Sequence, residues 1–147
     1  MSESKDFTVS LQLLENFVFK ADFGEFGYII TDEPAPLGNG EGPNPARLVA
    51  TGVANCLAAS LLFALQRKKQ RPKSLSAKAQ GELKKIDGFW RIAHIDVSLD
   101  IDVEELDKAI LQQSLALFED YCIVTQSIRT GFPVNVSVTD QAGNTLQ

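Results

Sequence analysis

The chain has few of the residues that most often carry metal or nucleophilic chemistry. Its 147 residues include two cysteines and one histidine. Two cysteines cannot form the framework of a disulfide-rich secreted protein. One histidine gives no basis for a Ser-His-Asp triad. A phosphate-binding loop is also missing, because no Lys-Ser or Lys-Thr pair follows the glycines Gly38, Gly40 and Gly42.

Positive charge is scarce as well. The chain has 14 Lys and Arg residues against 19 Asp and Glu, a net charge of −5. Duplex binding depends on neutralising phosphates with Lys and Arg, so we expect no nucleic acid as main partner. The basic run Arg67–Arg71 is therefore interpreted as a solvated helix end rather than an anion site. The polar segment Met1–Asp6 lacks the apolar core of a secretory signal, which makes the cytoplasm the expected compartment.

The overall composition is that of a globular protein. With 44% hydrophobic, 22% charged and 8% aromatic residues, the chain is predicted to be ordered over most of its length. Its length predicts one domain spanning residues 1–147. The run Leu48–Gln66 has no charged residue and is long enough to raise the question of a membrane span. It contains Thr51, Gly52 and Asn55, so we expect no membrane association but the buried centre of a domain or dimer.

Hydrophobic periodicity predicts three strands and then a long helix. Alternation from Phe7 to Leu13 is typical of a half-buried strand; Phe17 and Phe19 continue the pattern, and 28–31 is a third candidate strand. A loop rich in Gly and Pro follows. Asn44 is a suitable N-cap and Pro45 suits the first helical position, which predicts a helix from Pro45 to about Lys69.

The second half predicts a hairpin, two helices and a last strand. Asp87-Gly88 is a strong turn signal between strands at 75–83 and 90–101. Asp102 and Glu105 resemble a capping box for a helix to about Phe118, whose predicted buried stripe is Leu106, Ile110, Leu117 and Phe118. Asp120 is expected to cap a short helix that ends by Gly131, and Val134, Val136 and Val138 alternate as a final strand. The order predicts an α+β fold with a mostly antiparallel sheet around one long central helix.

Cys56 lies in the middle of the predicted long helix, with Gly52 and Ser60 one turn on either side. A cysteine in an apolar helix is commonly a small buried hydrophobe. The small neighbours would also let a substrate or another element approach the thiol. Because Cys56 is far from the helix N-terminus, a reactive thiolate there would need a nearby cation.

Cys122 lies in the first turn of the predicted short helix, where free N–H groups stabilise a thiolate. Glu119 and Asp120 act in the opposite direction, so the sequence leaves the sign of the pKa change open. The two cysteines are too far apart in sequence for a Cys-x-x-Cys pair, but they can still meet in the folded chain. His94 is interpreted as a surface strand residue, and a zinc site of Cys56, Cys122 and His94 has little support.

Several motifs together resemble the OsmC/Ohr family. Gly42-Pro43-Asn44-Pro45 opens an apolar helix that leads to Asn55-Cys56-Leu57, like the signature before that family's first cysteine. The segment 119–124, followed by Gly131-Phe132-Pro133-Val134, is similar to the surroundings of its second cysteine. Asp32-Glu33-Pro34 also fits the pattern. The resemblance extends from about Phe7 to Val138.

The resemblance implies an intertwined homodimer with its two long helices packed together, and a thiol peroxidase that reduces organic hydroperoxides or hydrogen peroxide. Cys56 would attack the peroxide and become a sulfenic acid, and Cys122 would condense with it to a disulfide. An external dithiol would then reduce the disulfide. This chemistry needs no metal and no organic cofactor.

The chain departs from the family pattern at two positions. The family has an Arg on an N-terminal strand, but this chain has no Arg before Arg47, and Lys20 is the nearest cation on a predicted strand. The family also has a Glu just after the helix-opening Pro, whereas Ala46 and Arg47 follow Pro45 here. We expect Arg47 to supply the missing charge as a third catalytic residue. It lies roughly 13.5 Å along the helix axis from Cys56, on the opposite face, so it would act on the cysteine of the partner subunit. The alternative function is a dimer that binds a small apolar or thiol-reactive ligand without efficient turnover.

Overall fold

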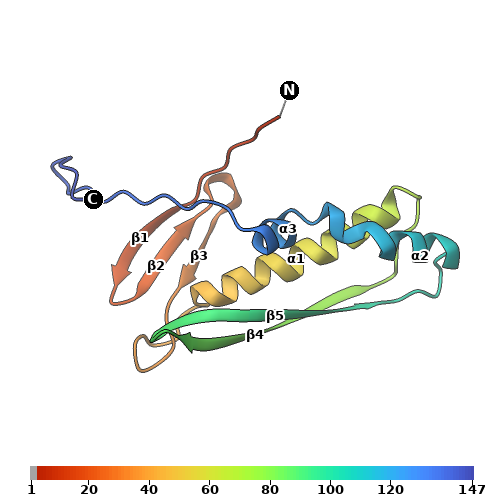
Figure 1. Cartoon of the computed structure of the whole chain (residues 1–147), viewed down its shortest axis with the longest axis horizontal. Helices are drawn as coiled ribbons and strands as arrows, with labels where there is room; N and C mark the ends of the chain where they lie inside the picture. Colours follow the sequence, from red (N-terminus) through yellow and green to blue (C-terminus); the bar gives the residue numbers. More distant parts are fainter. Residues whose placement is uncertain (1–2) are drawn as a thin grey trace. The chain divides into compact units, whose positions relative to one another are not determined.

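The computed structural model describes residues 3–147 (Figure 1). The chain forms two compact units. Unit 1 comprises the chain up to Ala54 together with Lys78–Ser98, and unit 2 comprises Asn55–Ala77 and Leu99–Gln147. The helices and strands, in chain order, are β1 (Ser10–Glu15), β2 (Val18–Asp22), η1 (Gly24–Phe26), β3 (Tyr28–Thr31), α1 (Pro45–Gln66), β4 (Leu75–Ile86), β5 (Phe89–Ile101), α2 (Lys108–Leu117), η2 (Phe118–Tyr121) and α3 (Ile123–Thr130). Helices and antiparallel strands confirm the α+β class.

Unit 1 contains a three-stranded sheet in the order β1-β2-β3, with both pairs antiparallel. The three predicted strands are therefore confirmed, although β1 begins at Ser10 rather than Phe7. All six residues of β1 are exposed in the described chain, including Leu11 at 61% and Leu13 at 55%. The expectation of a half-buried first strand is wrong for the single chain, because nothing in it covers either face of β1.

The loop between β3 and α1 folds around the carboxylate of Asp32, which is only 2% exposed. Its Oδ1 accepts a hydrogen bond from the backbone N–H of Glu33 at 2.7 Å, and its Oδ2 accepts bonds from those of Asn39 and Glu41 at 3.1 Å each. A side chain at Gly38 would overlap the Glu33 carbonyl oxygen, so the chain can pass there only as glycine. A short polar side chain thus satisfies the backbone of a segment that has no regular structure.

Helix α1 begins as the sequence predicts. The buried side chain of Asn44 accepts a hydrogen bond from the backbone N–H of Arg47 at 3.1 Å, the geometry of an N-cap. The helix ends at Gln66, before the predicted Lys69. Lys69 adopts a left-handed conformation (φ 59°), and the N–H of Gln70 bonds to the carbonyl of Leu65 at 3.0 Å. This is a Schellman-type end in which lysine takes the usual place of glycine.

The long hairpin is confirmed. Strands β4 and β5 form a two-stranded sheet, joined by Asp87 and Gly88. Both turn residues have positive φ, 53° and 84°, as a type I′ turn requires.

The core of unit 2 is an aliphatic cluster of Leu61, Leu65 and Leu106. Partly buried side chains from both chain segments of the unit pack against this cluster: Leu75, Leu99, Ile101, Leu111 and Phe118. Of the predicted stripe, Leu106 is buried, but Leu117 is exposed, and Ser114 is the buried residue of α2. The apolar face of α2 is therefore rotated from the predicted one.

Both predicted caps in this region are wrong. The side chain of Asp102 accepts from the N–H of Glu104 at 2.9 Å and closes a local turn, whereas Asp107 caps α2 by accepting from Ile110 at 3.0 Å. Aspartate can form either arrangement, and the local turn competes with a helix start at Asp102. Helix α3 begins after Cys122, which occupies the N-cap position predicted for Asp120, and ends at Gly131 as predicted.

The predicted final strand does not form within the described chain. Residues 132–147 contain only an isolated bridge between Thr139 and Thr145, and Figure 1 draws no arrow there. Val134 and Val136 are 76% and 69% exposed. A strand needs a neighbour for its ladder hydrogen bonds, and an alternating pattern alone does not supply one.

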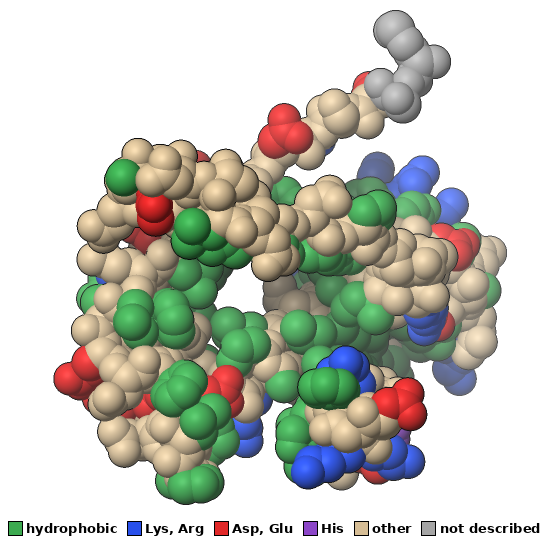
Figure 2. Space-filling model, turned by 60° about the vertical axis from the view of Figure 1, so that its left-hand side comes forward, with side chains coloured by type: hydrophobic (Ala, Val, Ile, Leu, Met, Phe, Trp, Pro, Cys, Tyr) green, Lys and Arg blue, Asp and Glu red, His purple; other side chains and the backbone are tan. Residues whose placement is uncertain are grey.

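Many large apolar side chains are exposed at the surface of the described chain (Figure 2). Within the described residues, α1 is the one helix long and apolar enough to cross a membrane, with a mean hydropathy of 2.0 over its most apolar stretch, of which 33% is buried. The core helix of a globular protein meets the same criterion.

We predict that Asp32→Asn destabilises the fold in a pH-dependent way. The backbone N–H of Glu41, assisted by those of Glu33, Asn39 and Gly40, holds the pKa of Asp32 below its ordinary value, against the opposing effect of burial. A lowered folded-state pKa stabilises the protein above the unfolded pKa of about 3.9, and this contribution is lost as the pH falls through the folded value. The difference in free energy of unfolding between wild type and Asp32→Asn should therefore be largest above about pH 5 and shrink below about pH 4.

Urea unfolding at a series of pH values measures this difference. Asp22→Asn is the matched control, because Asp22 is exposed and accepts a single backbone hydrogen bond, from Gly24. A stability loss in Asp32→Asn that is the same at every pH would contradict the assigned role of the carboxylate.

Candidate functional site

Both cysteines lie in unit 2, and both are free thiols. Cys56 is on α1 and partly buried, whereas Cys122 is completely buried at 0% exposure. Cys122 joins η2 to α3: its N–H donates to the carbonyl of Glu119, and its own carbonyl accepts from the N–H of Gln126, both at 3.1 Å. Its backbone is therefore fixed from both sides.

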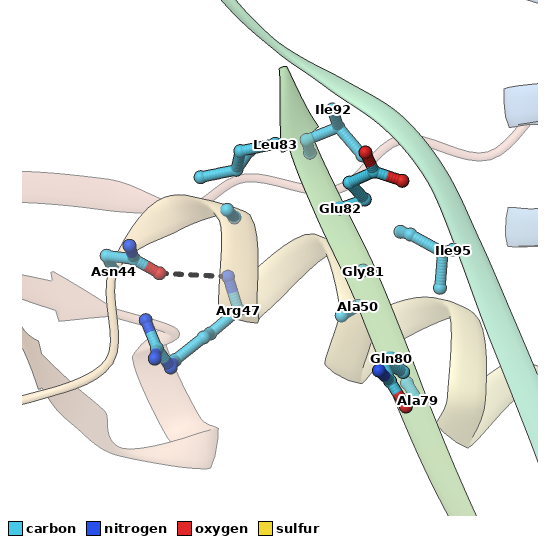
Figure 3. A pocket seen from close by; sticks show the side chains of 11 residues that line it. Asn44, Arg47, Ala50, Ala79, Gln80, Gly81, Glu82, Leu83, Ile92 and Ile95 are labelled. Atoms are coloured by element: carbon cyan, nitrogen blue, oxygen red, sulfur yellow. Dashed lines mark hydrogen bonds between the residues drawn. The ribbon is translucent and has the colours of Figure 1, made fainter.

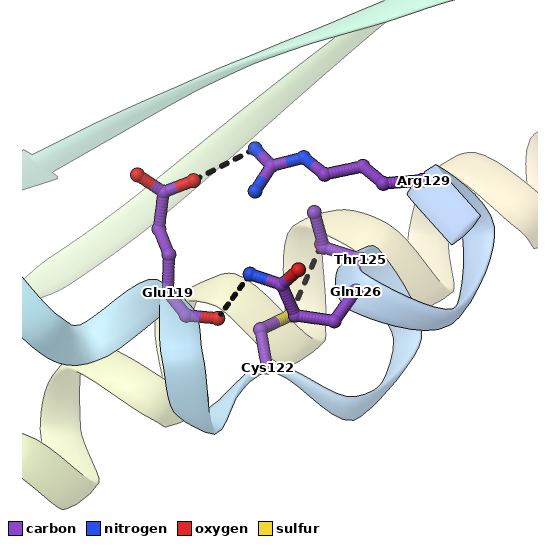
Figure 4. Close-up of polar contacts among 5 residues, drawn as sticks. All are labelled: Glu119, Cys122, Thr125, Gln126 and Arg129. Atoms are coloured by element: carbon purple, nitrogen blue, oxygen red, sulfur yellow. Dashed lines mark hydrogen bonds and ion pairs between the residues drawn. The ribbon is translucent and has the colours of Figure 1, made fainter.

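The Cys122 thiol is held by a hydrogen bond within α3. Its S–H donates to Oγ1 of Thr125, one turn along α3, at 3.0 Å (Figure 4). The side chains of Cys56 and Ser60 on α1 lie close enough to the same sulfur to lower its pKa. Cys56 and Ser60 are one turn apart on α1, so they present their side chains on the same face. The structure therefore brings together the two cysteines that are distant in sequence.

The surroundings of Cys122 decide whether the pKa of its thiol is raised or lowered, which the sequence left open. Burial is the largest influence and raises the pKa of the thiol. Once the thiol ionises, the Thr125 hydroxyl can donate to the sulfur, and together with the backbone N–H of Thr125 and the side chains of Cys56 and Ser60 it favours the thiolate against burial. These influences together prevail, and the pKa of Cys122 lies below its ordinary value.

The acidic residues before Cys122 do not reverse this result. The carboxylate of Glu119 is paired with the guanidinium of Arg129 at 2.7 Å, one pair drawn in Figure 4. The side chain of Gln126 donates to the carbonyl oxygen of Glu119 at 3.1 Å. The negative charge of Glu119 is therefore partly compensated by a cation from α3, and Asp120 is exposed to solvent.

Arg47 lies in unit 1, in the first turn of α1, with an exposed side chain. It lines a cavity of about 340 Å³ with residues of α1, β4 and β5, among them Ala50, Gly81, Glu82 and Ile95 (Figure 3). Along α1 it precedes Cys56 by roughly 13.5 Å of helix rise, so the helix itself keeps the two side chains of one chain apart. Lys20, the strand cation, lies over the ring of Tyr28 at 4.6 Å from the centroid.

His94 lies on β5 in unit 1, whereas both cysteines belong to unit 2. Its two ring nitrogens are each 3.4 Å from a carboxylate oxygen, one of Glu82 and one of Asp96, and its side chain is half exposed. Within residues 3–147 no three His, Cys, Asp or Glu side chains are grouped so that they could hold a metal ion.

Two side chains of the site were not identified as functional from the sequence. Thr125 follows Cys122 by three residues, and Ser60 follows Cys56 by four. Both spacings place a hydroxyl within one helical turn of a thiol, which is the signal that could have found them.

The chain is thus an α+β protein with a buried free cysteine at the N-cap of α3 and a second free cysteine on α1. A family model described as OsmC-like protein matches residues 38–137, and the chain belongs to that family. The matched part contains both cysteines and Arg47, whereas β1, β2, β3 and Asp32 precede it. None of the curated proteins compared with the chain matches it.

Solved structures share the fold at low sequence identity. An OsmC-like protein from Mycoplasma pneumoniae is 17% identical with a TM-score of 0.72, over 86% of this chain and 89% of that chain. The organic hydroperoxide resistance protein OhrB of Bacillus subtilis is 20% identical with a TM-score of 0.62, over 84% and 91%. A putative organic hydroperoxide resistance protein from Vibrio cholerae, with captopril bound in one of its active sites, is 18% identical with a TM-score of 0.64, over 88% and 89%.

We predict that Thr125→Val raises the pKa of Cys122. The substitution keeps the shape of the side chain and removes the hydroxyl that bonds to the sulfur, so burial is left with less opposition. Titration of the thiolate absorbance in a Cys56→Ser background isolates Cys122. Thr130→Val is the control, because its hydroxyl bonds to the carbonyl of Gln126 on the exposed part of the same helix. An unchanged titration in Thr125→Val would show that the hydroxyl does not act on the thiolate.

Proposed function

We propose that the protein is a cysteine-based thiol peroxidase that reduces organic hydroperoxides or hydrogen peroxide. The observation that carries the proposal is that the Cys56 side chain lies close enough to the buried Cys122 thiol to lower its pKa. Two neighbouring thiols are the arrangement that a sulfenate and its resolving cysteine need. The names of the similar structures from Bacillus subtilis and Vibrio cholerae support hydroperoxides as the substrate class.

In the first step the Cys56 thiolate attacks one oxygen of the peroxide. The sulfur–oxygen bond forms as the oxygen–oxygen bond breaks, and the leaving alkoxide or hydroxide takes a proton to become an alcohol or water. The sulfur loses two electrons to the peroxide and becomes a sulfenic acid. Cys56 is assigned this role because it is the more accessible of the two sulfurs.

In the second step the Cys122 thiolate attacks the sulfur of the Cys56 sulfenic acid. A disulfide forms, and the hydroxyl group leaves as water after taking a proton. A lowered pKa increases the thiolate fraction of Cys122 near neutral pH, which favours this step over further oxidation of Cys56. An external dithiol then donates two electrons, becomes a disulfide itself and restores both thiols. The steps need no metal or organic cofactor, and we propose the cytoplasm as the compartment, since dithiol pools are kept reduced there.

Peroxide reduction by single-cysteine variants tests the proposal. Cys56→Ser should lose rapid peroxide consumption, because the attacking sulfur is gone. Cys122→Ser should react once and then accumulate sulfenic or sulfinic acid on Cys56, because the resolving thiol is missing. Stopped-flow kinetics with organic and inorganic peroxides and mass spectrometry of the products give both results.

An unreacted Cys56 in Cys122→Ser would reject the assigned roles. Slow peroxide consumption by the wild type with both thiols reduced would favour the alternative function, a protein that binds a small apolar or thiol-reactive ligand.

We also propose that the protein acts as a homodimer. The apolar side chains on β1 and at Val134 and Val136 are exposed in the single chain, and the apolar helix α1 is only 33% buried over its most apolar stretch. Large exposed apolar surface commonly marks an interface. Sedimentation at micromolar concentration should give twice the chain mass of 16.1 kDa. A monomer would reject the dimer and, with it, any action of Arg47 across an interface.

We propose that Arg47 activates Cys56 of the partner subunit. Its exposed guanidinium is too far along α1 to reach Cys56 of its own chain, and a mid-helix thiolate needs a cation within about 4–6 Å. Arg47→Ala should slow peroxide reduction by about tenfold, the effect of losing roughly 1.4 kcal/mol of transition-state stabilisation, without unfolding the protein. Arg71→Ala removes the same charge from an exposed position and is the control. Equal rates in both variants would show that Arg47 is only a surface residue.

A further inference from the structure

One face of α1 carries four side chains that all point to the segment before α3. Cys56, Ser60, Phe63 and Arg67 recur at intervals of three and four residues, which places them in one row along a helix. The first two lie close enough to the Cys122 sulfur to lower its pKa. The other two contact Tyr121, the residue that precedes Cys122 in the chain.

Tyr121 is held by an aromatic contact and a hydrogen bond. Its ring meets that of Phe63 edge to face, with centroids 4.9 Å apart and planes at 83°. An Nη1 hydrogen of Arg67 is donated to the Tyr121 hydroxyl at 2.9 Å. The guanidinium carbon also lies 6.0 Å from the Phe63 ring centroid and 5.8 Å from that of Tyr121, at the outer limit of a cation–π contact.

Tyr121 directly precedes Cys122 in the chain, so a movement of Tyr121 would also move Cys122. Tyr121 ends the single turn of η2, and the next residue's N–H closes back on Glu119 at 3.1 Å. The Tyr121 side chain is half buried, whereas the Cys122 side chain is fully buried. A displacement of Tyr121 from α1 would therefore carry the Cys122 sulfur away from Cys56 and Ser60.

We propose that Phe63, Arg67 and Tyr121 form a clamp that positions the Cys122 thiol against Cys56 and thereby sets how readily the two sulfurs form a disulfide. In catalysis, a role that rests on the proposed function, the clamp makes capture of the Cys56 sulfenic acid faster than its further oxidation. These three are positioning residues, because none of them exchanges electrons or protons with the peroxide. The peroxide reaction of Cys56 itself does not depend on them.

The equilibrium of the cysteine pair with glutathione tests the clamp without using peroxide. One protein thiolate attacks oxidised glutathione, forms a mixed disulfide and releases one glutathione thiolate. The second protein thiolate then attacks the mixed disulfide, forms the Cys56–Cys122 disulfide and releases the second glutathione. The equilibrium constant measures the effective concentration of one protein thiol at the other, which falls when the two sulfurs are held less closely.

Two variants remove the clamp from opposite sides. Arg67→Met keeps an apolar stem and removes the donor, and Tyr121→Phe keeps the ring and removes the acceptor. Each should lower the equilibrium constant by about three- to tenfold, the range expected for loss of one ordinary intramolecular hydrogen bond. Arg67→Lys retains a cationic donor and should recover part of the loss. Lys68→Met is the control, because it makes the same charge change at the adjacent exposed residue.

The outcomes are separable. A fall in Arg67→Met and Tyr121→Phe but not in Lys68→Met supports the clamp, and the double variant should then be no worse than either single one. Equal constants in wild type, Arg67→Met and Tyr121→Phe would overturn the clamp and leave the proposed peroxidase in place. Equal falls in Arg67→Met and Lys68→Met would also overturn it, because net charge alone would then explain the effect. No disulfide in the wild type at any glutathione ratio would overturn the two-cysteine mechanism itself.

Discussion

The polar surroundings of the Cys122 sulfur are the constraint on which the proposed chemistry depends. Thr125 on α3 is hydrogen-bonded to the sulfur, and Cys56 and Ser60 on α1 lie close enough to lower its pKa, so one buried atom is influenced from two helices. Burial alone would raise the pKa of the thiol and make it inert. The three polar partners outweigh that effect while keeping the sulfur out of solvent. A polar site inside an apolar setting is stable only when its members are satisfied, and no buried side-chain nitrogen or oxygen of the described residues lacks a partner.

Elements whose signals are local could be predicted from the sequence. Asn44-Pro45 marks the start of α1 and Asp87-Gly88 marks the hairpin, because a cap and a two-residue turn are decided by a few neighbouring residues. The elements that depend on distant partners could not be predicted. Residues 134–137 have the alternation of a strand but pair with no other strand in the described chain. The failure at Asp102 has a local cause, because the side chain has the spacing of a cap but closes a competing local turn.

The features of the candidate site also divide into those that could be predicted from the sequence and those that could not. The identity of Cys56 and Cys122 as a pair came from a resemblance in their surrounding motifs, since two isolated cysteines in a sequence carry no information on whether they meet. The direction of the Cys122 pKa change is the sum of burial and several hydrogen bonds of opposite effect, and such a sum needs coordinates. The salt bridge between Glu119 and Arg129 likewise joins residues ten apart, beyond the reach of one helical turn.

The loop around Asp32 uses backbone N–H groups, not side chains, as its donors. The side chains of Asn39 and Glu41 are exposed, although their N–H groups bond to the carboxylate. The fold therefore depends little on which side chains occupy positions 39 and 41, whereas position 38 must be glycine. These two positions, just before the start of α1, are suited to carry a fluorescent or spin reporter that leaves the backbone hydrogen bonds to Asp32 in place.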